Sequence, residues 1–152
     1  MSKKTPLGRL KRKLDTEFGK MVMQRDAGLQ CVSCGIKPGT QPGHFMRRGL
    51  QATRWHPQNV HTQCFRCNCV ESGNQLEYAE FLDRRYGSGT SHYLRALSKT
   101  SWKPSSEALQ ALIESAKLGH ESYAETWEVY GSDAEVAVPI KHKPIKDCEL
   151  PF

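Results

Sequence analysis

The chain has 152 residues, of which 38% are hydrophobic and 25% charged, and its formal net charge is +6. This length suits one domain with appendages and one modest core. No apolar run approaches the roughly eighteen residues that span a membrane, and the first residues lack an apolar signal segment. We therefore expect a cytoplasmic protein with no membrane partner.

The first predicted element is an amphipathic helix over residues 1–28. Large apolar side chains recur there every three or four residues, and the other face is basic. Residues 29–87 form the next unit, whose first half is rich in Gly and Pro and predicts short strands and loops. Asn74, with a glutamate three residues later, predicts a capped helix that directs Leu76 to the core and ends at Gly87.

Residues 88–130 predict a helical extension and are the candidate surface for a homodimer. A short helix is expected over Ser91–Ser98, and another is expected to start at Ser105 or Ser106. Residues 131–152 hold three prolines and no helical period, which predicts a flexible or partner-bound tail. The predicted fold class is α+β, with flanking helices around a small core.

Charge is distributed unevenly along the chain. Residues 1–100 hold 17 Lys or Arg against 7 Asp or Glu, whereas residues 101–152 hold 5 against 9. No acidic residue stands between Asp26 and Glu71. Such a stretch attracts polyanions, which favours a nucleic acid partner, although a solvated basic surface gives the same pattern. The candidate phosphate contacts are Lys11, Arg12, Arg47, Arg48, Arg54 and Arg66.

Four of the six cysteines form two pairs, each with two residues between its members. Two thiolate pairs at this spacing can close a tetrahedron around Zn²⁺, and a reducing compartment disfavours disulfides. A redox dithiol would belong to a βαβ setting, which the pattern does not show. We predict a structural zinc site at Cys31, Cys34, Cys64 and Cys67, with Cys69 as a small buried side chain.

Several polar residues stand between and just after the cysteine pairs: His44, Asn59, His61, Asn68 and Glu71. Each alone is more often a surface or hydrogen-bonding residue than a catalytic one. Their order resembles that of a zinc-stapled His-Me finger nuclease. In that order a histidine follows the first cysteine pair, an asparagine precedes the second pair, and another asparagine follows the last cysteine.

The segments "GHFMRRG", "TRWHPQNVHTQCFRCN" and "SGNQLEYAEFLDRRYG" make the resemblance specific. Over residues 12–87 the chain resembles the phage NinG family, also called Rap, of recombination endonucleases acting on branched DNA. Its zinc frame also resembles that of phage endonuclease VII. The resemblance implies a ββα-metal core within residues 29–87. It implies Mg²⁺- or Mn²⁺-dependent hydrolysis of Holliday junctions and D-loops in a bacterial host, with recombination proteins as further partners.

The resemblance also implies roles for the site residues. His44 would be the general base, since a neutral imidazole can accept the proton of a water molecule. Asn68 and Glu71 would offer oxygen ligands to Mg²⁺. Asn59 would orient the imidazole, and His61 would be a further metal ligand, a second base or a phosphate contact.

One departure from the related nucleases concerns the position directly before the catalytic histidine. An acidic metal ligand usually stands there, whereas this chain has Gly43. Two alternatives to a junction nuclease stay open: a nicking nuclease of the HNH type without junction preference, and a non-catalytic zinc module that binds DNA in recombination. His44 together with Asn68 favours catalysis, and symmetric cutting of two strands favours a C₂ dimer.

Overall fold

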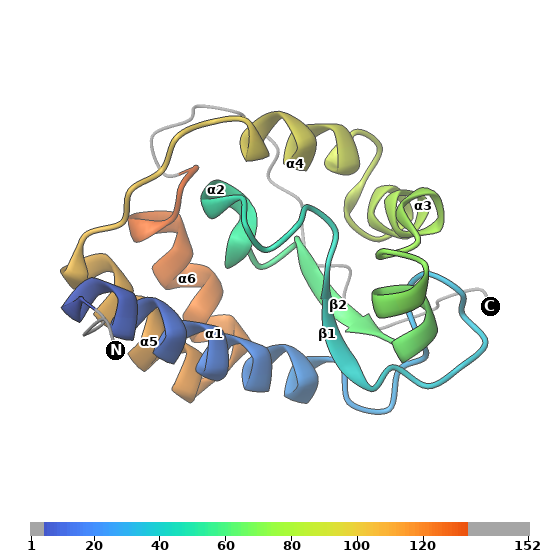
Figure 1. Cartoon of the computed structure of the whole chain (residues 1–152), viewed down its shortest axis with the longest axis horizontal. Helices are drawn as coiled ribbons and strands as arrows, with labels where there is room; N and C mark the ends of the chain where they lie inside the picture. The colour runs from blue at the N-terminus through green and yellow to red at the C-terminus, as the bar shows by residue number, and fades with distance from the viewer. Residues whose placement is uncertain (1–4, 134–152) are drawn as a thin grey trace.

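The computed structural model describes residues 5–133, a mixed fold in which helices surround a two-stranded sheet (Figure 1). Helix α1 (Pro6–Arg25) begins where the Thr5 hydroxyl accepts a hydrogen bond from the Gly8 amide. The apolar period predicted this helix, although Leu7 at its start is exposed. No helix within the described range is both long and apolar enough to span a bilayer.

The sheet is a hairpin of β1 (Gln41–His44) and β2 (Val60–Gln63), which pair antiparallel. The short helix α2 (Gln51–Arg54) lies in the connection between them. Gly43 stands opposite His61, and His44 stands opposite Val60. Because successive side chains of a strand alternate between faces, His44 and His61 lie on opposite faces of the hairpin.

A single π-helical turn, η1 (Arg66–Val70), follows β2 and leads into α3 (Gln75–Tyr86) and α4 (Thr90–Ser98). Asn74 does precede α3, but the predicted side-chain cap at Asn74 is wrong. Asn74 adopts a left-handed conformation with φ 47° and makes no side-chain cap bond; its amide donates to Cys67 Sγ instead. Leu76, predicted to face the core, is 69% exposed because this turn of α3 faces solvent.

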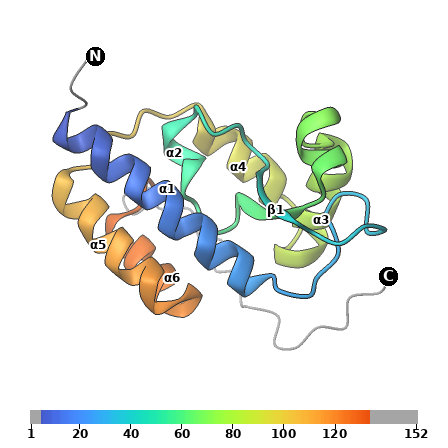
Figure 2. The ribbon, with the colours of Figure 1, turned by 60° about the horizontal axis from the view of Figure 1, so that its bottom comes forward.

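Helices α5 (Ser106–Leu118) and α6 (His120–Tyr130) complete the described fold. The apolar face of α5 packs along α1, as Figures 1 and 2 show together. One buried cluster joins these helices to the hairpin and includes Leu14, Phe18, Leu109, Leu112, Trp55, Val60, Tyr123 and Trp127. The apolar face of α5 is therefore buried inside the chain.

The predicted tail, residues 131–152, begins with residues that belong to the fold. Asp133 accepts hydrogen bonds from the Tyr93 hydroxyl at 2.8 Å and the Trp127 indole at 2.7 Å, and it pairs with His56 at 3.0 Å. Burial opposes ionisation of Asp133, but His56 and Tyr93 outweigh it and lower its pKa to about 2. The remainder of the predicted tail lies outside the described residues.

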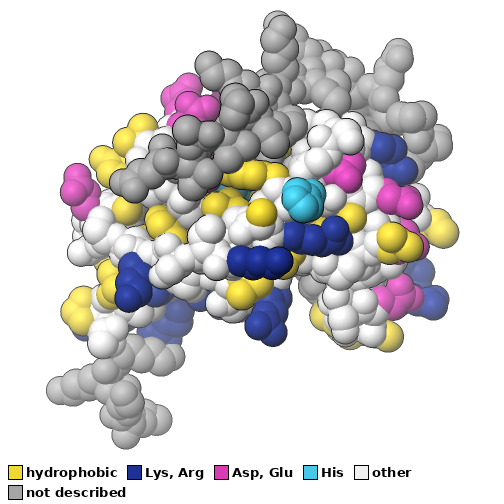
Figure 3. Space-filling model, turned by 90° about the horizontal axis from the view of Figure 1, so that it is seen from above, with side chains coloured by type: hydrophobic (Ala, Val, Ile, Leu, Met, Phe, Trp, Pro, Cys, Tyr) yellow, Lys and Arg dark blue, Asp and Glu magenta, His cyan; other side chains and the backbone are white. Residues whose placement is uncertain are grey.

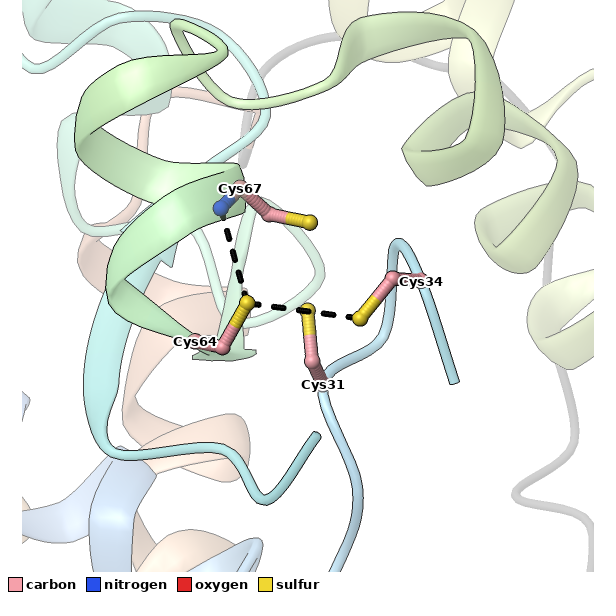
Figure 4. Close-up of side chains that lie close together, drawn as sticks. All are labelled: Cys31, Cys34, Cys64 and Cys67. Atoms are coloured by element: carbon pink, nitrogen blue, oxygen red, sulfur yellow. Dashed lines mark hydrogen bonds between the residues drawn. The ribbon is translucent and has the colours of Figure 1, made fainter. Parts of the chain in front are cut away.

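The four cysteines of the predicted zinc site meet beside η1 (Figure 4). Their sulfur atoms all lie within 4.8 Å of one another, and those of Cys34 and Cys64 are 4.0 Å apart. Tetrahedral Zn²⁺ with bonds of about 2.3 Å requires sulfurs roughly 3.8 Å apart, so the cluster fits this ion. These residues could hold a structural zinc. Cys69, predicted to be buried, is exposed and donates to Gln41.

We expect Cys64→Ser to lose zinc and to lower the melting temperature strongly, because metal binding supplies folding free energy to such a site. Cys69→Ser is the matched control, since the Cys69 thiol is exposed and stands outside the cluster. Elemental analysis and thermal denaturation of the two purified variants measure both effects. Folded parent protein with less than one zinc per chain would contradict the assignment.

Candidate active site

A cavity of about 470 Å³ lies between α1, the hairpin and the start of the η1–α3 connection. Its lining brings together His44 from β1, Asn68 from η1, Arg47 and Arg48 from the loop after β1, and Asp15 from α1. A candidate base, an asparagine and two arginines therefore line one hollow. Among these, Asp15 is the residue that sequence reasoning missed. It is the first acidic residue in a basic N-terminal stretch, which was its only signal.

His44 is held in one tautomer by the backbone. Its Nε2 atom lies 3.0 Å from the carbonyl oxygen of Arg54. Because a carbonyl oxygen only accepts, Nε2 carries the proton and Nδ1 keeps a lone pair. Burial lowers the pKa of His44 to about 4, and the positive charge of Arg48 acts in the same direction. The imidazole is thus neutral at physiological pH and can act as a base.

Asp15 binds two arginines at the cavity wall. It accepts hydrogen bonds from Arg54 Nε at 2.9 Å, from Arg48 at 2.7 Å and from the Trp55 indole at 2.9 Å. Burial opposes its ionisation, but the bonds and charges of Arg54 and Arg48 prevail and lower its pKa. The Arg54 side chain is only 15% exposed, whereas that of Arg48 is 61% exposed. Arg54 is therefore engaged inside the chain, and Arg48 is the better candidate for a phosphate.

Asn68 presents an oxygen that could bind a metal. Its Nδ2 atom donates to the side-chain oxygen of Gln41, which leaves Oδ1 without a protein partner among residues 5–133. Glu71 follows η1 and pairs with Arg66 at 2.8 Å on the surface, outside the cavity lining. Because η1 is a single π turn that ends before Glu71, the i, i+3 spacing of an α-helix does not place Asn68 and Glu71 on one face. Arg66 is thus paired with Glu71, and its side chain is 67% exposed.

Asn59 does not contact the imidazole as predicted. Its Oδ1 accepts from the Met46 amide at 2.8 Å, and its Nδ2 donates to the carbonyls of Met46 and Thr53 at 3.0 and 2.9 Å. Both amide protons are thereby used. Asn59 instead fixes the backbone two residues after His44, so it acts on the loop that leaves β1.

His61 is buried on the face opposite His44, and both of its nitrogens are bonded. Nδ1 lies 3.2 Å from the hydroxyl of Tyr78, and Nε2 lies 2.6 Å from that of Tyr86. Its ring also packs edge-on against Phe81. None of the three roles predicted for His61 fits this setting, because neither nitrogen is available to a metal, a water molecule or a phosphate.

Gly43 has no space for a side chain. A Cβ atom there would lie 1.8 Å from Oε1 of Gln63. Gln63 is fixed in this orientation because its Nε2 donates to Ser33 Oγ at 2.7 Å and to the Gly73 carbonyl at 2.8 Å. The amide of Gln63 therefore fills the volume that an acidic residue before His44 would need.

Further basic side chains lie outside the cavity. Lys11 lies one turn of α1 before Asp15 and therefore on the same face of the helix. Arg12, the next residue, is exposed. Seen from the α4 side, the surface carries Lys and Arg side chains among hydrophobic ones (Figure 3). Arg95 and Lys99, one turn apart, are exposed there. The basic surface is thus wider than the predicted set.

Comparison with known proteins gives the family. Residues 2–122 match the family model described as Bacteriophage Lambda NinG protein. The chain is 35% identical over 69 residues to Protein ninG of Salmonella phage P22, Escherichia phage lambda and Escherichia phage 933W. This match spans 43% of the chain but only 34% of each relative's length, and no solved structure matches. Because the family model covers most of the chain, the protein belongs to the bacteriophage lambda NinG family.

Proposed function

We propose that this protein is a metal-dependent endodeoxyribonuclease that cuts branched recombination intermediates such as Holliday junctions. The observation that carries the proposal is the state of His44: neutral, tethered through Nε2 and lining the same cavity as Asn68. A binding module has no need of a tethered neutral base beside an unpartnered amide oxygen. The succession of hairpin and η1, with the base on β1, also resembles the order of a His-Me finger.

Phosphodiester hydrolysis needs an activated water, a neutralised phosphate and a stabilised leaving oxygen. Nδ1 of His44 would accept the proton of the attacking water, while the Arg54 carbonyl holds the ring through Nε2. Arg47 and Arg48, which line the cavity, would neutralise the phosphate. A bound divalent cation would act as a Lewis acid and stabilise the leaving oxygen.

Asn68 Oδ1 fits this cation, because hard divalent ions prefer oxygen ligands and Mg²⁺ keeps several waters. Glu71 could join after leaving Arg66. Since both partners of that pair are at least a third exposed, breaking it costs little, about 0–1 kcal/mol. The preference for branched DNA rests on the family resemblance. Symmetric cutting would need a second copy of the chain or two successive events.

The substrate is tested by incubating purified protein and Mg²⁺ with a four-way junction, a fork and a linear duplex of equal length. We expect cleavage of the junction in preference to the duplex, and binding that weakens steeply with salt. Arg48→Ala should reduce the dependence of log affinity on log salt by about one, whereas Lys117→Ala on α5 should not. Equal binding and cutting of junction and duplex would exclude the branched-DNA preference.

Catalytic roles are tested by His44→Ala and Asn68→Ala. Loss of the base should reduce the cleavage rate by about 10²–10⁴-fold while zinc content and DNA binding persist. Asn68→Ala should be partly restored by high Mg²⁺ or Mn²⁺, and His44→Ala should not. For the parent, kcat/KM should stay level from pH 7 downward and fall only near pH 4, since His44 is neutral above that value. Parental cleavage by folded His44→Ala protein would refute the scheme.

Gly43→Asp, which restores the acidic residue of related nucleases, is expected to destabilise the protein, because the new Cβ would overlap Gln63. Adding Gln63→Ala opens that space and should recover part of the melting temperature. Thermal denaturation of the single and double variants measures this coupling. A Gly43→Asp single variant as stable as the parent would show that Gln63 does not fill the position.

A further inference from the structure

Three hydrogen-bonded side chains cross the face of the hairpin opposite His44. The hydroxyl of Tyr86 lies 2.6 Å from Nε2 of His61, and Nδ1 of His61 lies 3.2 Å from the hydroxyl of Tyr78. The Tyr78 hydroxyl then donates to the carbonyl of Gly43 at 2.8 Å. This line of hydrogen bonds therefore starts at Tyr86 on α3 and passes through His61 on β2. It then passes through Tyr78 on α3 and ends at Gly43, directly before His44.

Each bond in this line has one allowed direction. The Gly43 carbonyl only accepts, so Tyr78 must give its proton to it. The Tyr78 oxygen then accepts from Nδ1–H of His61, and Nε2 of His61 accepts from Tyr86. Burial lowers the pKa of His61 and raises that of Tyr78, which keeps the imidazole neutral and the phenol protonated. In this state both nitrogens of His61 and the Tyr78 hydroxyl are bonded.

The Tyr78 hydroxyl contacts β1 and the residue just before β2, next to His44. It lies 2.8 Å from the Gly43 carbonyl and 3.4 Å from the Asn59 carbonyl, which itself accepts from the Phe45 amide at 2.8 Å. Tyr78 has no exposed surface, and its ring packs 5.4 Å from that of Phe45. The Tyr78 hydroxyl therefore contacts the carbonyl before His44 directly and reaches the amide after His44 through the Asn59 carbonyl.

A buried histidine must bond both ring nitrogens, because an unbonded polar atom in a core carries a desolvation cost. A leucine would pack there without that cost. What the imidazole adds is a donor that fixes the rotation of the Tyr78 hydroxyl. Since a displacement of about 1 Å at a reacting group can cost roughly 100-fold in rate, this rotation has a functional consequence.

We infer that His61 and Tyr78 are positioning residues, which set the place of His44 from the opposite face of the hairpin by holding the Gly43 carbonyl. This inference rests on the proposed nuclease function. It gives His61 a role that excludes metal binding and contact with DNA. It also explains why both nitrogens of His61 end on tyrosine hydroxyls and neither reaches the cavity.

The kinetic test compares Tyr78→Phe, His61→Leu and the double variant with Tyr93→Phe. The control also loses one tyrosine bond of 2.8 Å, a partly buried one to Asp133, away from the hairpin. We expect kcat to fall about 10- to 100-fold in the first three variants, with KM for DNA, zinc content and Mg²⁺ requirement unchanged. The double variant should be no slower than the slower single variant, because both remove one line of bonds.

His61→Asn keeps an N–H donor toward Tyr78 and should recover most of the kcat lost in His61→Leu. Parental kcat in folded Tyr78→Phe would overturn the inference, and so would losses that multiply in the double variant. If Tyr78→Phe does not fold, the comparison of His61→Leu with His61→Asn decides the same point. An altered Mg²⁺ requirement in His61→Leu would instead make His61 a metal ligand.

A measurement independent of activity uses ¹⁵N NMR of the histidine side chains. His61 is expected to carry its proton on Nδ1, and Tyr78→Phe should shift the amide signals of His44 and Phe45 while Tyr93→Phe leaves them in place. A proton on Nε2 would overturn the line. If the parent cleaves no DNA, the proposed function fails, yet these spectra still decide whether Tyr78 positions His44.

Discussion

The closure of two cysteine pairs around one point is the constraint on which the candidate site depends. Cys34 and Cys64 lie 30 positions apart in sequence, and their sulfurs are 4.0 Å apart. Residues between α1 and β1 bury few apolar side chains; Ile36, for example, is 79% exposed. A core cannot hold this segment, so the cysteines must. Their closure sets η1 beside β1, where Asn68 meets Gln41.

A second constraint comes from two carboxylates of α1 and its cap. Asp15 and Asp26 stand three helical turns apart, and so on one side of the helix. Asp15 binds Arg54 and Trp55, whereas Asp26 accepts the Thr62 amide at 2.9 Å and pairs with Arg25. Asp15 thus fastens the hairpin connection to α1, and Asp26 fastens strand β2 to the end of α1. A basic, acid-free central segment needs such partners from elsewhere, because its own arginines would otherwise repel one another.

The sequence predicted the features that depend on apolar periodicity within a helix and on the spacing of the cysteine pairs. Apolar repeats located α1, α4 and α5, and the paired cysteines do form one cluster. It did not predict the contacts that depend on which residues of the two strands stand opposite each other. His44 and His61 looked alike as histidines of one hairpin, but the alternation of side chains separates them once Gly43 is known to face His61. Asp15 was missed for a similar reason, since its partners lie more than 30 positions away.

The two faces of the hairpin have different tasks. The face with His44 lines the cavity, and the Arg54 carbonyl holds Nε2 of His44 while Nδ1 keeps its lone pair. The other face carries His61, Gln63 and Gln41, whose polar atoms bond α3, the cysteine loop and η1. Polar bonds have fixed directions and lengths, whereas apolar contacts tolerate sliding, so a polar inner face specifies one register of a four-residue strand. Gly43 belongs to that arrangement, because only a residue without Cβ lets Gln63 cross behind His44. In the proposed nuclease, the position of His44 thus depends also on the face of the hairpin that does not line the cavity.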